Sequence, residues 1–336
     1  TGPKTINANF VKKKYTLTIE IEGEGNVETK IIQPGLATDY NSGTVLELTA
    51  LANDNWAFIE WQGDINSYEN PIQVTMDKEK TIKAVFNDIT YPFYFDANGV
   101  TVKAKKGVVP GLKGKVEGYP DGEIYTAVDN ETLHNMANNG EDMTRVVTTF
   151  VTSMSGLFNG SGSVNPNAGT FNQDISSWDT SNVEYMLNMF LQAHNFNQDI
   201  SYWDTAQVIN ISGMFWRATS FNQDIGNWDV SNVTTMKWMF NEAISFNQNI
   251  GNWDTGQVTD MQVMFRYARE FNQDIGNWDV SNVTNMIQMF NGATIFNQDI
   301  GDWDVGKVQW MGAMFQDAKQ FNQDISSWNT SKVIAM

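Results

Sequence analysis

The chain has 336 residues, of which 41% are hydrophobic and 18% are charged, so it can build cores and is too long for one ordinary domain. It has no cysteine and two histidines, which excludes disulfides, thiol catalysis and Cys-based zinc sites and leaves little for a histidine-centred triad. The formal net charge is −18, with 21 Lys and Arg against 39 Asp and Glu. We therefore expect no nucleic-acid partner and no binding to anionic membranes, and no apolar run approaches the about 20 residues that span a bilayer.

Residues 14–88 have the pattern of a small β-rich module. Segments 15–21, 44–50 and 81–86 alternate apolar and polar residues and are rich in β-branched side chains, which predicts strands. Residues 5–10 (TINANF) closely copy residues 81–86 (TIKAVF). Residues 1–13 are therefore expected to be the end of a preceding module. Because the chain begins Thr1-Gly2-Pro3 without Met or a signal peptide, we expect a fragment of a longer secreted polypeptide.

The motif WAFIEWQGD at 56–64, followed by NPIQVTM at 70–76 and the closing TIKAVF, resembles the divergent internalin B-repeat. This resemblance implies a stalk module of bacterial surface proteins.

Residues 89–150 are expected to cap the repeats that follow. They open with YPFYF at 91–95 and a turn at 96–99, and residues 129–136 read as a capped helix with His134 on its surface. The ends of repeat arrays are usually atypical because they cover an exposed core.

From residue 151 to residue 336 the chain is a tandem repeat. The segment FNQDI, or a close copy, begins at Phe171 and recurs every 25 residues up to Phe321. Trp follows the same period from Trp178 to Trp328, and seven of the twelve Trp and thirteen of the twenty Phe occupy such repeated positions. Aromatic residues at one fixed position of every repeat indicate a shared core, because stacked repeats bury the same position in each coil.

Within one repeat the apolar spacing predicts two elements. Apolar residues at 233, 236, 240 and 243 have the spacing of a helical stripe, and residues 225–230 alternate as a short strand. The pattern FNQDI-x-x-WD-[VT]-x-x-V-x-x-M-x-x-MF-x-x-A resembles the repeat of BspA-like leucine-rich-repeat surface proteins of bacteria. We therefore expect an α+β repeat protein: a small β-rich module followed by a leucine-rich-repeat-like solenoid with a short parallel strand and a short helix in each coil.

Two polar series follow the same period. Asp204, with equivalents in the neighbouring repeats, either accepts backbone N–H groups in Asx turns or helix caps, or binds calcium, or contacts a ligand. The Asn-Gln-Asp series that starts at Asn172 is expected to be a stacked ladder that satisfies turn backbone.

Other repeat positions vary freely, among them those equivalent to 184, 185, 187, 188, 191, 192, 194 and 195, and some of them carry exposed aromatic candidates for binding. The complete set of candidate ligand-binding residues is Tyr185, Tyr202, Asp204, Trp216, Asp229, Trp238, Asp254, Tyr267, Asp279, Asp304 and Trp310.

No nucleotide-binding, metalloprotease or hydrolase motif occurs in a usable context. We therefore expect no enzyme, cofactor, metal or membrane insertion. The two family resemblances imply an adhesin or binding protein of the bacterial cell surface, extracellular, with a protein or carbohydrate partner. The alternatives are a purely structural spacer and a calcium-dependent repeat module.

Overall fold

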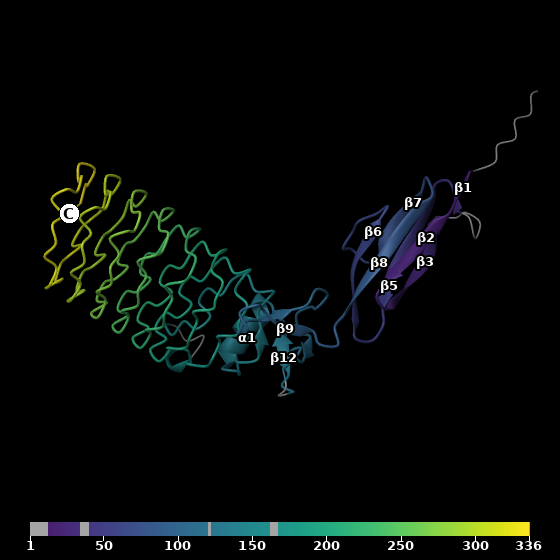
Figure 1. Ribbon diagram of the computed structural model, residues 1–336, viewed down its shortest axis with the longest axis horizontal. Coiled ribbons are helices and arrows are strands. Elements are labelled where there is room, and N and C mark those ends of the chain that lie inside the picture. Colours follow the sequence, from purple (N-terminus) through teal and green to yellow (C-terminus); the bar gives the residue numbers. More distant parts are fainter. Residues whose placement is uncertain (1–12, 34–39, 120–121, 162–166, 336) are drawn as a thin grey trace, which may run out of the picture. The chain divides into compact units, whose positions relative to one another are not determined.

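The computed structural model describes residues 13–33, 40–119, 122–161 and 167–335 (Figure 1). Residues 5–10, which were predicted to belong to the end of a preceding module, lie outside these ranges. The chain divides into two compact units: Thr1–Pro92 with Lys105–Val109, and Phe93–Ala104 with Pro110–Met336.

The first unit consists of strands in small sheets. β2, β8 and β6 form one three-stranded sheet, in which β2 is parallel and β6 antiparallel to the central β8, and β3, β5 and β7 form an antiparallel one. β1 pairs with β4. The strands are β1 (Lys14–Tyr15), β2 (Leu17–Glu22), β3 (Gly25–Gln33), β4 (Tyr40–Asn41), β5 (Thr44–Ala52), β6 (Trp56–Gly63), β7 (Ile72–Met76) and β8 (Lys80–Asp88).

The core of the first unit follows from the alternation of its strands. Along β5, Leu46, Leu48 and Ala50 are buried, and the residues between them are half-buried. They pack with Trp61, whose Nε1–H donates to the Glu69 carbonyl at 3.0 Å. Strands are present in the three segments where alternation predicted them, 15–21, 44–50 and 81–86.

The second unit begins with short paired strands and the one α-helix of the described residues. The helix predicted over 129–136 is confirmed: Asp129 caps α1 by accepting the Thr132 N–H at 2.8 Å, and Gly140 ends it with φ 68°. His134 is half-buried, so it is less exposed than predicted. The elements are β9 (Phe93–Phe95), β10 (Val102–Ala104), β11 (Lys113–Gly114), β12 (Tyr125–Ala127), α1 (Asn130–Asn139), β13 (Val146–Val147) and the 3-10 helix η1 (Ala168–Thr170).

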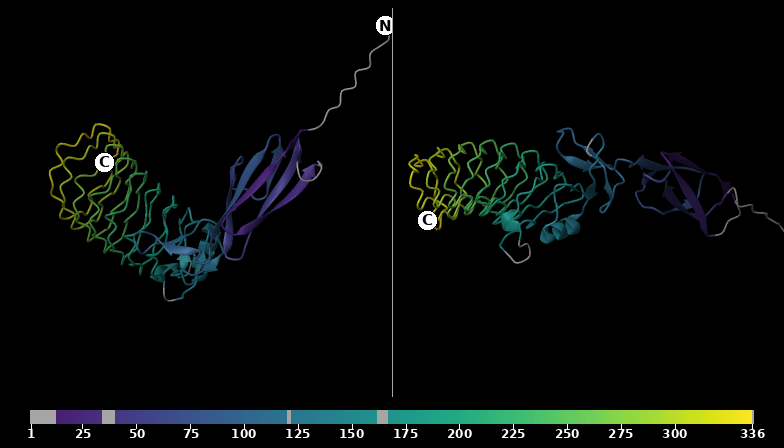
Figure 2. Two further views of the ribbon diagram at one scale, coloured as in Figure 1. Left: turned by 45° about the vertical axis from the view of Figure 1, so that its right-hand side comes forward. Right: turned by 90° about the horizontal axis from the view of Figure 1, so that it is seen from below.

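From residue 151 onward the second unit is a series of similar coils lying side by side (Figures 1 and 2). Isolated parallel bridges join one residue of each coil to its equivalent in the next. Beyond the first step these residues are 25 positions apart, which is the period of the sequence. The bridged residues are Ser153, Tyr185, Asn210, Thr235, Asp260, Asn285, Trp310 and Ala335.

The repeated aromatic residues form the core, as predicted. Equivalent Trp rings of neighbouring coils stack, with centroids 6.3 Å apart and planes 5° apart for Trp253 and Trp278. Phe240 and Phe246 stack within one coil at 3.9 Å. Each indole N–H of this series also donates to a backbone carbonyl. For example, Trp253 Nε1 donates to the Ile225 carbonyl of the preceding coil at 3.1 Å. The repeat therefore buries its aromatic rings without leaving the indole donor unsatisfied.

The predicted fold class is wrong. Among the described residues, the α-helix lies before the repeats and the strands lie in several small sheets, with isolated bridges in the coils. The chain is therefore not an α+β leucine-rich-repeat solenoid with a strand and a helix in each coil. The predicted strand at 225–230 is a turn, in which the Trp228 N–H donates to the Ile225 carbonyl at 3.2 Å.

The segment predicted to be a helix, residues 233–243, is a run of turns whose backbone alternates two kinds of hydrogen bond. The Met236 N–H donates to the Asp260 carbonyl of the next coil at 3.0 Å, whereas the Met239 N–H donates to the Met236 carbonyl at 3.1 Å. Trp238 and Glu242 have φ of 61° and 58°. Positive φ values four residues apart are incompatible with a right-handed α-helix. They are the backbone conformation of consecutive turns.

Candidate ligand-binding surface

The repeated aspartates are exposed and hold Asx turns. The side chain of Asp229 accepts the backbone N–H of Ser231 at 3.0 Å, and Asp204, Asp254, Asp279 and Asp304 accept the equivalent N–H at 2.9–3.1 Å. Hydrogen bonds from the Ser231 side chain and backbone hold the pKa of Asp229 below its ordinary value. The Asx-turn interpretation is therefore confirmed, whereas the helix caps are excluded because no helix follows in the described coils.

The same aspartates do not gather into a cluster. Within residues 13–33, 40–119, 122–161 and 167–335, no three His, Asp or Glu side chains are placed to hold a metal ion. The Asp304 carboxylate already accepts the Gly306 N–H at 3.0 Å. Calcium generally takes six to eight oxygen ligands, and this row offers one carboxylate per coil.

We predict that calcium does not stabilise the protein. Because each Asp carboxylate is used in a local turn, removal of divalent ions with EDTA is expected to leave the melting temperature unchanged. Thermal unfolding with EDTA and with about 1 mM calcium measures this. A rise of several degrees with calcium would contradict the prediction, because an ion bound only by the folded state stabilises it by mass action.

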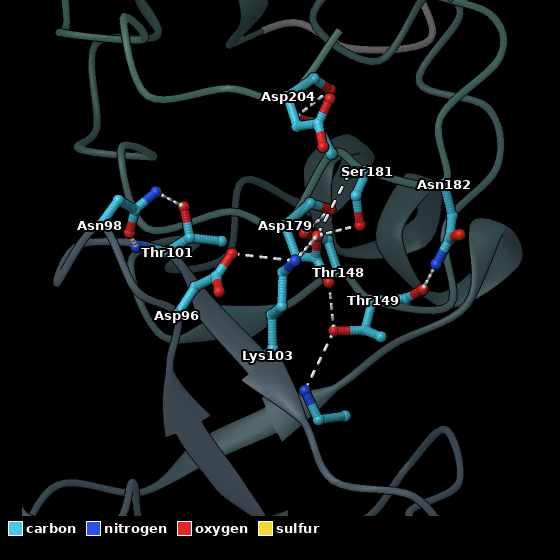
Figure 3. A network of polar contacts seen from close by, with 12 residues as sticks. Asp96, Asn98, Thr101, Lys103, Thr148, Thr149, Asp179, Ser181, Asn182 and Asp204 are labelled. Carbon is cyan, nitrogen blue, oxygen red and sulfur yellow. Dashed lines mark hydrogen bonds and ion pairs between the residues drawn. The ribbon is translucent and has the colours of Figure 1, made fainter. Parts of the chain in front are cut away.

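The first member of the Asp row, Asp179, lies in a different environment (Figure 3). It is 2% exposed and accepts hydrogen bonds from the Thr149 hydroxyl at 2.7 Å and the Ser181 hydroxyl at 2.6 Å. The Lys103 ammonium from β10 lies 3.9 Å from Asp179 and 2.9 Å from Asp96. This network ties the β9–β10 hairpin to the first coils, so its role is structural.

We predict that acid loosens this hairpin. Hydrogen bonds from the Lys103 ammonium and then from the Ala97 N–H lower the pKa of Asp96. A carboxyl with a lowered pKa in the folded state stabilises the fold above its unfolded pKa, and this contribution is lost as the pH falls through the folded pKa. The Val102 N–H, which donates to the Ser177 carbonyl at 2.8 Å, is therefore expected to lose protection from hydrogen exchange as the pH falls below about 4, the ordinary pKa of an Asp carboxyl. Asp96→Asn should flatten this dependence, and equal pH dependence in both proteins would contradict the prediction.

The Asn-Gln-Asp series forms the stacked ladder that the sequence predicts. The Asn247 Oδ1 accepts the backbone N–H of Asn272 at 3.0 Å and the Gln273 Nε2–H at 2.9 Å. Equivalent bonds link the other coils, and Asp274 accepts the Gly276 N–H at 2.9 Å. These side chains are engaged by neighbouring backbone, and they are structural rather than ligand-binding.

The structure brings only some of the candidate aromatic residues together. The rings of Trp216 and Trp238 are 5.7 Å apart. Tyr185 and Trp310 are both exposed and occupy the bridged position, but they are separated by four intervening bridged residues, from Asn210 to Asn285. Tyr202 is 47% exposed and is next in sequence to the buried Trp203.

An open depression of about 490 Å³, here called the variable groove, crosses four coils. Its lining comes from two repeat positions, both among those predicted to vary. The first position contributes Gln192, Arg217, Glu242 and Tyr267, and the second contributes His194, Thr219, Ile244 and Arg269. Of the sequence-predicted candidates, Tyr267 lies in this groove.

The groove has a fixed ion pair at its centre. Arg217 Nε donates to Glu242 Oε2 at 3.0 Å, and its Nη2 donates to Oε1 at 3.2 Å. The Arg217 guanidinium also lies 5.9 Å from the Trp216 ring centroid. A two-point contact of this kind orients both groups, so the carboxylate and the guanidinium present defined edges to the groove.

The wall formed by Tyr267 is also held in place. The ring lies so close to Gly292 that a Cβ there would be 2.1 Å from a ring carbon, and Gly292 has φ 70°. The Arg266 guanidinium is 4.5 Å from the ring centroid, within range of a cation–π interaction. Gly292 is therefore required both by its backbone conformation and by the Tyr267 ring.

Sequence reasoning missed the charged residues of the groove. The chain has four arginines, and three of them, Arg217, Arg266 and Arg269, line the groove or stack on its Tyr267 wall. Their clustering between residues 217 and 269 of an acidic chain is a signal present in the sequence. Aromatic content and the repeated Asp residues do not reveal this cluster, because the arginines occupy positions that vary from repeat to repeat.

Two family models match the chain. The divergent InlB B-repeat domain matches residues 15–90, which confirms the internalin B-repeat resemblance. As a module of bacterial surface proteins, it points to an extracellular location. No helix among the described residues has the length and apolar character needed to cross a bilayer.

The repeats match a different model from the one expected. Residues 128–253 and 234–336 match DUF285, described as "Mycoplasma protein of unknown function". Neither matching model is a leucine-rich-repeat model, so the expected kinship with BspA-like leucine-rich-repeat proteins is not supported. No curated protein and no solved structure matches the chain significantly. Since the two matched segments together cover more than half of the residues, the chain belongs to the DUF285 family.

Proposed function

We propose that the chain is a non-enzymatic binding protein of the bacterial cell surface. In this proposal the InlB B-repeat module acts as a stalk, and the coils bind a protein or a glycan on another surface. The observation that carries the proposal is the variable groove, because its eight lining residues differ from coil to coil while the core positions and the Asn ladder are repeated almost unchanged.

The contrast between repeated and variable positions supports recognition rather than spacing alone. A spacer needs only the stacked rings and the ladder, which every coil supplies. At the groove positions, by contrast, adjacent coils place Arg217 beside Glu242 and Tyr267 beside Gly292, and each pair fits together. Such pairing of unlike residues gives one location along the array a unique surface, which a specific partner needs.

Binding to an array of immobilised host proteins and polysaccharides tests the proposal. We expect the chain to retain at least one ligand and Tyr267→Ala to weaken that binding. Tyr202→Ala is the matched control, since Tyr202 is an exposed tyrosine beside the Asp row and outside the groove. Binding of no ligand would favour the structural spacer. A loss with Tyr202→Ala alone would move the binding site to the Asp row.

A further inference from the structure

We propose that the variable groove binds a glycan segment that carries a carboxylate, with Arg269 on the carboxylate and the Arg217–Glu242 pair on hydroxyl groups. This inference rests on the proposed binding function and specifies its ligand.

The charge of the groove is opposite to that of the chain. The chain carries a formal net charge of −18, yet the groove is lined by two arginines, Arg217 and Arg269, against one carboxylate, Glu242. A third arginine, Arg266, stacks on the Tyr267 ring. Arg269 is exposed and has no ion pair among the described residues, so its guanidinium is free to bind an anion. The Nε atom of Arg266 is also buried, and it has no hydrogen-bond partner among the described residues. The groove is therefore a local site for an anionic group, of the kind that Arg binds with two parallel hydrogen bonds.

The Glu242 carboxylate limits how much negative charge a ligand can bring. It is half-buried, fixed by Arg217 and lies in the same groove as Arg269. A polyanion with a charge on every unit, such as a nucleic acid or a densely sulfated polymer, would place negative charge against it. A ligand with an isolated carboxylate and nearby O–H donors satisfies Arg269 and Glu242 together.

The remaining lining favours hydroxyl groups over an extended peptide. Gln192, His194 and Thr219 offer side-chain groups that donate or accept, as sugar hydroxyls also do. An extended peptide binds most readily to a free strand edge, but the bridged residues of these coils already pair with their neighbours on both sides. Tyr267, held by Gly292 and Arg266, adds a rigid aromatic side chain to this lining, against which C–H groups of a sugar could pack.

An array of carboxylated glycans tests this inference on the full chain. It would carry hyaluronan oligosaccharides and sialylated lactose, whose carboxylates are separated by neutral sugars, each with a neutral counterpart, together with heparin and hexaglutamate. We expect at least one carboxylated glycan to bind and its neutral counterpart not to bind. Arg269→Gln should weaken that affinity about tenfold or more, because a hydrogen bond to a charged group contributes more than the about 1.4 kcal/mol that equals a factor of ten.

Lys319→Gln is the matched control, since Lys319 occupies the same repeat position two coils beyond Arg269, is exposed and does not line the groove. It should leave binding unchanged, and both variants should keep the wild-type melting temperature. Equal loss in both variants, or preference for heparin, hexaglutamate or the neutral glycans, would overturn the inference. If the chain binds a protein or a neutral glycan through Tyr267, the proposed function stands and the carboxylate inference fails, whereas no binding to either array would refute both.

Discussion

Replacement of Trp253 by alanine is expected to lower the free energy of unfolding by about 3–5 kcal/mol, the usual cost of truncating a buried aromatic side chain. The ring is 4% exposed, lies 6.3 Å from Trp278 and 6.4 Å from Phe240, and donates its indole hydrogen bond to the Ile225 carbonyl. Alanine would leave a cavity between coils and an unsatisfied carbonyl. Chemical denaturation of the variant and the wild type measures the difference.

Tyr202→Ala is the control for this experiment. Tyr202 is 47% exposed, so its removal is expected to change the free energy of unfolding by less than about 0.5 kcal/mol. A change of less than about 1 kcal/mol for Trp253→Ala would show that the stacked rings do not carry the stability of the array. Comparison of the two variants therefore separates burial from the mere loss of an aromatic residue.

The part of the fold that the sequence predicts well is the part set by burial. Trp253 and its equivalents were expected in the core from their period alone, and they lie there. The Asn247 ladder was also predictable, because a polar residue repeated at a fixed position next to the core needs a repeated backbone partner.

The backbone conformation of the coils was not predictable from apolar spacing. Val233, Met236, Phe240 and Ala243 are all buried, as a helical stripe would bury them. Consecutive turns bury the same set, because they also bring positions three and four residues apart to one side. The positive φ values fall on residues as different as Trp238 and, in the next coil, Val263, so no run of Gly or Asn marked the turns.

The groove was predictable in position but not in chemistry. Its two rows were among the positions expected to vary, and Tyr267 was among the candidate residues. The pairing of Arg217 with Glu242, and of Tyr267 with Gly292, depends on the 25-residue offset between adjacent coils. The two residues of each pair occupy equivalent positions in adjacent coils but are of different types. The repeat pattern of the sequence therefore does not indicate that they are in contact.

The last described coil presents apolar side chains that the inner coils bury. Phe321, Ile325 and Trp328 are only partly buried, whereas their equivalents Phe296, Ile300 and Trp303 are at most 3% exposed. A depression of about 530 Å³, lined by Met314, Phe315, Ile325 and Trp328 among others, lies at this end of the array. This surface has the apolar composition of the interface between two neighbouring coils, but no further described coil covers it.

Extension of the chain after residue 335 by a copy of residues 286–310 is therefore expected to raise the free energy of unfolding by several kcal/mol. The added coil would bury side chains worth about 1.5–3 kcal/mol each, and neighbouring repeats stabilise one another through their shared interface. Thermal and chemical unfolding of the extended and original chains measure the gain. The control is the same extension with Ser in place of its Phe and Trp residues, which adds length without the interface. If both extensions leave stability unchanged, the stacking of aromatic rings between coils is not what holds the array together, and the expected loss in Trp253→Ala should then fail as well.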